Sequence, residues 1–97
     1  MPSTTYEVAH IREQGQDMII IPVSSSLSNM SNTKQNELRD SLQLYARDAG
    51  LAGEVCLVWE TGNRFYFIAP NLWHPFFKGM SMNFVARNIN KKLTCKS

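Results

Sequence analysis

The sequence predicts an α+β domain in which four antiparallel strands form one sheet and two helices pack on one of its faces. Three observations lead to this prediction. Two stretches have the pattern of β-hairpins, a glycine lies at each expected turn, and a segment with helical spacing follows each hairpin. Two hairpins and two helices in the order ββαββα most simply build such a sheet. A chain of 97 residues is expected to form one domain, spanning 1–97.

The clearest hairpin covers residues 54–70. β-Branched and aromatic residues flank Gly62 and Asn63, and a glycine that comes first in a two-residue loop suits a type II′ turn. Residues 6–23 predict a second hairpin, turning at Gly15 and Gln16. Its segment 7–21 is similar to 54–68, which indicates either an internal duplication or two unrelated hairpins with the same turn chemistry. The residues shared by both segments are Glu7, Val8, Glu13, Gly15 and Ile21 in the first.

A helix is expected after each hairpin. Thr33 is placed to cap a helix over residues 34–49, and Gly50 is placed to end it. Ser81 is placed to cap a second helix over residues 82–93, where apolar residues recur at helical spacing. The chain is therefore expected to consist of a hairpin-helix unit over residues 6–50, a second unit over 54–93, and a frayed tail over 94–97.

Strand alternation places apolar side chains on both faces of the predicted sheet, and two helices can cover only one of them. The second face then needs a cover: the aromatic connector 73–77 folded over it, a second copy of the chain, or a ligand or another protein. A second copy is the favoured cover, and a homodimer is therefore predicted. The residues expected in its interface are Ile19, Ile21, Val55, Leu57, Trp59, Tyr66 and Ile68.

Catalytic and metal-binding patterns are missing from the sequence. Cys56 and Cys95 are expected to be free thiols, and Cys56 is expected to act as a small buried hydrophobe. His10 and His74 stand alone, without a second ligand at the spacing typical of metal sites. The sequence therefore predicts no metal, no cofactor and no enzymatic activity.

Two further binding functions are alternatives to self-association. A net charge of +2 selects no partner, but basic residues near the C-terminus suit contacts to the phosphates of nucleic acid. Aromatic side chains could instead wall a pocket for a small apolar or cationic ligand. The nucleic-acid candidates are Arg64, Lys78, Arg87, Lys91 and Lys92, and the pocket candidates are Trp59, Tyr66, Trp73 and Phe77.

No apolar run is long enough to span a membrane, and the first residues lack the pattern of a secretory signal. A cytoplasmic protein without membrane contact is expected. The leading functional prediction is a small non-enzymatic module that binds proteins, chiefly a second copy of itself.

Overall fold

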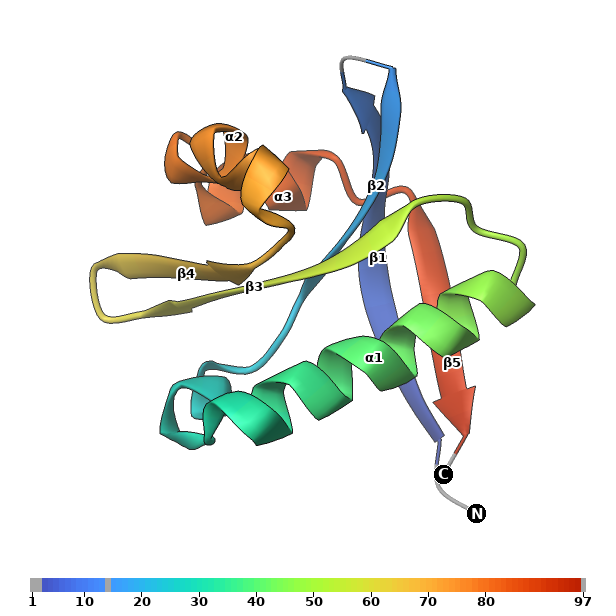
Figure 1. The fold of residues 1–97 in the computed structure, drawn as a ribbon, viewed down its shortest axis with the longest axis horizontal. Helices are drawn as coiled ribbons and strands as arrows, with labels where there is room; N and C mark the ends of the chain where they lie inside the picture. The colour runs from blue at the N-terminus through green and yellow to red at the C-terminus, as the bar shows by residue number, and fades with distance from the viewer. Residues whose placement is uncertain (1–2, 14, 97) are drawn as a thin grey trace.

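A mixed five-stranded sheet lies at the centre of the computed structural model, which describes residues 3–13 and 15–96 (Figure 1). The strand order is β4-β3-β2-β1-β5, so β4 and β5 are the two edges. The α+β class predicted from the sequence is confirmed. The elements in chain order are β1 (Ser3–Glu13), β2 (Gln16–Pro22), the 3₁₀ helix η1 (Ser25–Asn29), α1 (Asn32–Asp48), β3 (Glu54–Thr61), β4 (Arg64–Ile68), the 3₁₀ helix η2 (Asn71–Trp73), α2 (His74–Lys78), α3 (Met82–Arg87) and β5 (Lys91–Lys96).

The predicted all-antiparallel sheet is wrong at the junction of the two hairpins. Strands β2 and β3 run parallel, with Ile19 opposite Val55. The reason is the long connection between them: α1 has 17 residues and a length of about 26 Å, so it carries the chain back along the sheet to the end at which β2 began. Figure 1 shows α1 running across β1 and β5, with its end leading through a loop into β3.

Both hairpins are present, but the first turns one residue earlier than predicted. Glu13 pairs with Gln16, so the turn lies between these residues instead of at Gly15 and Gln16. In the second hairpin, Thr61 pairs with Arg64 around the predicted Gly62-Asn63 turn. Moving a turn by one residue shifts the pairing by two, which leaves each side chain on the same face. Residues predicted to share one face, such as Ile21 and Leu57, therefore still share it.

The helices cover both faces of the sheet, instead of one as predicted. On the first face, α1 and η1 enclose a core that includes Leu27, Leu42 and Ala46. On the second face, η2, α2 and α3 supply Trp73, Phe77 and Val85 to a separate core. The aromatic connector therefore does cover a face of the sheet, but not the face that was expected to need a cover. Helix α1 lies over the face of Ile19 and Leu57, and the connector lies over the opposite one. None of the described helices is long and apolar enough to cross a membrane.

The last predicted helix ends early, and a fifth strand takes its place. Helix α3 starts as expected, with the Ser81 hydroxyl accepting a hydrogen bond from Phe84 N, but it stops at Arg87. The Asn88 side chain then donates to Phe84 O, and the chain continues as β5 beside β1. Residues 94–96, predicted to be a frayed tail, form the end of this strand, and residue 97 lies outside the described residues.

The helix after the first hairpin is confirmed with a different cap. The Ser31 hydroxyl accepts from Lys34 N at 3.2 Å, so the helix begins two residues before the predicted start. Its last turn is followed by Gly50 in the left-handed region, with φ of 81°. The predicted end of this helix therefore rests on the glycine that the sequence indicated.

Candidate functional site

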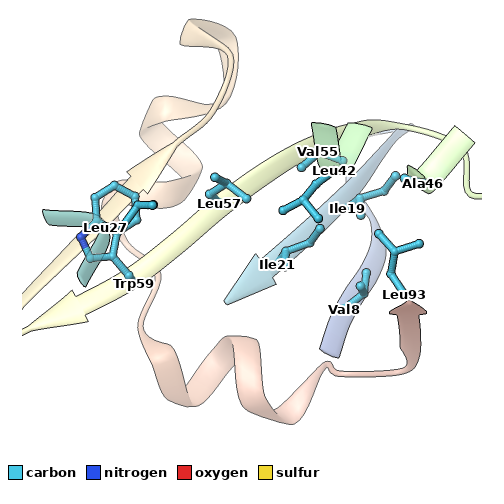
Figure 2. Close-up of a cluster of buried hydrophobic side chains, with 10 residues drawn as sticks. All are labelled: Val8, Ile19, Ile21, Leu27, Leu42, Ala46, Val55, Leu57, Trp59 and Leu93. Carbon is cyan, nitrogen blue, oxygen red and sulfur yellow. The ribbon is translucent and has the colours of Figure 1, made fainter. Parts of the chain in front are cut away.

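The predicted dimer interface lies mostly in the core of the monomer. Ile19, Ile21, Val55 and Leu57 are completely buried in the core that α1 covers. Figure 2 shows the first three around Leu42, and Leu57 between them and Trp59. A second copy cannot reach them without displacing α1. The prediction that these residues form an interface is therefore wrong, while the oligomeric state itself stays a prediction.

The remaining interface candidates lie at the margin of this core. The Trp59 ring is 4% exposed, and its Nε1 donates to Ser28 Oγ at 2.7 Å. Tyr66 stacks on Trp59, with ring centroids 5.7 Å apart and planes 13° apart, and is 37% exposed. Ile68 is partly buried on the same face. Tyr66 and Ile68 therefore present surface at the β4 edge that the buried members of the predicted interface do not.

The four aromatic residues predicted to wall one pocket lie on opposite faces of the sheet. Trp59 and Tyr66 lie on the α1 face, whereas Trp73 and Phe77 belong to the core of the other face. Phe77 is fully buried and stacks on Phe67, with ring centroids 5.3 Å apart. The sheet separates the two pairs, so the prediction of a single pocket is wrong. Trp73 contributes instead to a different hollow of about 370 Å³, together with Glu13, Gln16, Met18, Leu72, Pro75 and Phe76.

The basic residues predicted to bind nucleic acid are spread over the molecule. Arg64 starts β4 at one edge of the sheet, while Lys91 and Lys92 start β5 at the opposite edge. Lys91 and Lys92 are neighbours on a strand, so their side chains point to opposite faces, and Lys92 lies across from Glu7. Lys78 and Arg87 end α2 and α3. The five cations do not form one surface, and nucleic-acid binding stays a prediction of the sequence alone.

The cysteine and the two histidines whose side chains the structure describes are held in structural contacts. Cys56 is buried, and desolvation raises the pKa of its thiol to about 12, so the reactive thiolate is scarce at neutral pH. His10 Nε2 lies 2.9 Å from Ala52 O, and His74 Nε2 lies 2.9 Å from Ala69 O. Over residues 3–13 and 15–96, no three His, Cys, Asp or Glu side chains gather as metal ligands would. The Cys95 side chain lies outside the described part of the structure.

The two edges of the sheet differ in chemistry, which sequence reasoning missed. Strand β5 begins with two exposed lysines, a common guard against pairing with another strand. Strand β4 reads Arg-Phe-Tyr-Phe-Ile, and its only charged residue, Arg64, stands at its end. This contrast was visible in the sequence. It had no meaning until the topology showed that these two segments are the edges.

The backbone of β4 leaves hydrogen-bonding groups free on its outer side. A two-residue turn closes on a hydrogen-bonded pair, so Arg64, Tyr66 and Ile68 direct their N–H and C=O groups to β3. The backbone of β3 agrees with this alternation. Val55 lies beyond the end of β4, and its N–H and C=O, which point to the side on which β4 lies, bond to side chains of α1 instead. The N–H and C=O groups of Phe65 and Phe67 consequently point away from the sheet.

A groove runs beside β4 on the α1 face. One hollow of about 330 Å³ is lined by Tyr66 and Ile68 among others, and a second of about 360 Å³ is lined by Ile68 and Asp40. The two share Ile68, so they are adjacent. Helix α1 contributes a polar stripe to their walls, at helical spacing: Asn32, Gln35, Asn36, Arg39 and Asp40.

Comparison with known proteins does not place the chain. No family model, no curated protein sequence and no solved structure matches it significantly.

Proposed function

We propose that this protein is a small interaction module that binds an extended protein segment along the outer edge of β4. The single observation that carries the proposal is the contrast between the two edges. Strand β5 carries lysines, while β4 presents aromatic and aliphatic side chains around a free backbone. An unguarded apolar edge is a template for pairing with another strand, because the incoming chain satisfies its N–H and C=O groups.

The groove supports the same proposal by offering side-chain recognition. An added strand would lie beside β4 and place alternate side chains on the α1 face. These side chains would lie next to Tyr66 and Ile68 and against the polar stripe of α1. Backbone hydrogen bonds would give affinity, and these contacts would give specificity. Binding to a strand also needs no catalytic group, which agrees with the buried thiol of Cys56 and the backbone-bound rings of His10 and His74.

The experiment uses a display library of random eight-residue peptides selected against the immobilised protein. The best peptide is titrated into ¹⁵N-labelled protein, and the backbone amides of Phe65 and Phe67 are expected to shift more than those of β5. Tyr66→Lys, which adds a guard charge to β4, should weaken binding by roughly tenfold or more.

The matched control is Thr94→Lys, which adds the same charge to an exposed position of the opposite edge. It should leave peptide binding within about a factor of two, because the added charge lies on the far side of a five-stranded sheet. Thermal melts of both variants verify folding, since Tyr66→Lys also loses the stack on Trp59. Selected peptides that shift β5 or α3 instead of β4, or a selection that yields no binder to the edge, would contradict the proposal.

A further inference from the structure

We infer that the segment bound by β4 is β4 of a second copy, paired antiparallel about Tyr66 so that Arg64 of each copy faces Asp40 of the other. This inference rests on the proposed function, because it names the partner of the same edge.

The free backbone groups select the register. Two β4 strands related by a twofold axis at Tyr66 place Phe65 opposite Phe67 of the other copy, and Phe67 opposite Phe65. These are the residues whose N–H and C=O groups point outward, so both pairs become hydrogen-bonded pairs and supply about four backbone bonds. A centre at any other residue of β4 uses fewer of these groups. The resulting assembly has one continuous sheet across the two copies.

Charge complementarity supports this register. Arg64 lies on the same face of β4 as Tyr66 and Ile68, which is the α1 face, and the pairing sets it opposite Ile68 of the other copy. The hollow beside Ile68 is lined by Asp40, whose side chain is 71% exposed. Within the monomer, Asp40 contacts Arg39 at 3.3 Å, but Arg39 is also held by Glu54 and Gln43. A second cation at Asp40 would therefore be favourable.

The polar stripe of α1 also fits a copy of β4. On the α1 face, an added β4 strand presents the guanidinium of Arg64 and the phenol of Tyr66, both of which can donate hydrogen bonds. The side chains of Asn32, Gln35 and Asn36 offer amide oxygens along the groove. Gln35 Nε2 already donates to Leu27 O at 2.8 Å, and a strand with only apolar residues on this side would offer the amide oxygens of the groove no donor. Pairing β4 with β4 is also closed after two copies, whereas pairing β4 with β5 would propagate into a filament.

The test exchanges the two charges on separate chains. Arg64→Glu alone sets a carboxylate against Asp40, and Asp40→Lys alone sets an ammonium against Arg64, so each variant should dimerise at least tenfold more weakly than the natural chain. In an equimolar mixture, both contacts become attractive: the new glutamate of one chain meets the new lysine of the other, and Arg64 meets Asp40. Sedimentation velocity should therefore show the dimer restored in the mixture.

The natural chain should sediment at about twice its 11.1 kDa mass at high concentration and dissociate on dilution. Both substituted side chains are exposed, so thermal melts should match the natural chain within a few degrees. A monomer at every concentration, a dimer that neither variant weakens, or a mixture no more dimeric than its parts would overturn the inference. If the natural chain is a monomer but a selected peptide still shifts Phe65 and Phe67, this inference fails and the proposed function stands.

Discussion

The side-chain amide of Asn90 makes the two hydrogen bonds to the main chain of His10 that the backbone of a paired strand residue would make. Asn90 Oδ1 accepts from His10 N at 2.9 Å, and Asn90 Nδ2 donates to His10 O at 2.9 Å. The main chain of Asn90 adds a bond to Val8 O at 3.0 Å. One residue thus prolongs the β1–β5 pairing beyond the first residue of β5, and it explains why the chain leaves the helix after α3.

Replacing Asn90 should loosen this junction. Asn90→Ala removes both side-chain bonds to His10, and urea unfolding should show a loss of about 1–2 kcal/mol. Asn90→Asp is the matched comparison, because it keeps the acceptor for His10 N and replaces the donor to His10 O by a second acceptor. At neutral pH its carboxylate faces the His10 carbonyl oxygen, so this variant should also be less stable than the natural protein. Equal stability of all three proteins would mean that β5 needs no help from this amide.

Gly53 should be the glycine least tolerant of substitution. Its φ is 117°, and a Cβ there would lie 2.5 Å from Asp17 O, because the loop before β3 passes closely over the start of β2. Gly53→Ala is expected to cost roughly 3 kcal/mol or more in the free energy of unfolding. Gly62→Ala is the control: its φ is also positive, at 62°, but nothing lies within 4 Å, so the cost should be only about 1 kcal/mol. Similar losses for both would rule out the steric explanation.

Gln43 should contribute more to the free energy of unfolding than a polar residue on a helix usually does. It is a buried polar side chain that donates to Gly53 O at 3.1 Å and accepts from Val55 N at 2.8 Å. Gln43→Ala leaves both backbone groups unpaired at the start of β3, and chemical denaturation should register a loss of about 2–4 kcal/mol. The neighbouring Leu44→Ala, at a position 63% exposed, should change stability by less than about 0.5 kcal/mol. A small effect of Gln43→Ala would show that water replaces its bonds.

The Cys56 thiol should make the protein less stable in alkali. Burial raises its pKa from 9.0 to about 12, so the folded state holds a proton that the unfolded state releases. The stabilisation is complete below pH 9 and is lost as the pH rises toward 12. Cys56→Ala removes the titrating thiol. Across that window the free energy of unfolding of the natural protein should therefore fall by roughly 1.4 kcal/mol per pH unit more than that of the variant. Parallel stability curves for the two proteins between pH 9 and 12 would contradict this account of the buried thiol.

Local patterns predicted the hairpins well because their causes are local. Gly62 supplies the turn of the second hairpin, and strand alternation correctly predicted apolar side chains on both faces of the sheet, where Leu57 and Val58 now lie on opposite sides. The parallel pairing of β2 with β3 was not predictable in this way. It depends on where α1 returns the chain, and the contacts that fix it, such as those of Gln43 with Gly53 and Val55, join residues that are distant in sequence.

The predicted interface residues were misplaced for a related reason. Leu57 and Val55 read as an exposed apolar face because the sequence could not show that helices cover both sides of the sheet. Residues 88–93 kept helical spacing, yet Asn90 bonds to β1 and Leu93 enters the α1 core, so β5 became the guarded edge. Only after that change does β4 stand out as the unguarded one.

Hydrogen exchange at the sheet edges measures the central claim directly. The amides of Phe65 and Phe67 point outward and should exchange quickly in dilute protein, then become protected by tenfold or more as the concentration rises and β4 pairs. The amides of Lys92 and Thr94 in β5 should show no such dependence. Protection of Phe65 and Phe67 that does not change with concentration, or concentration-dependent protection that appears in β5 instead, would contradict pairing through the β4 edge.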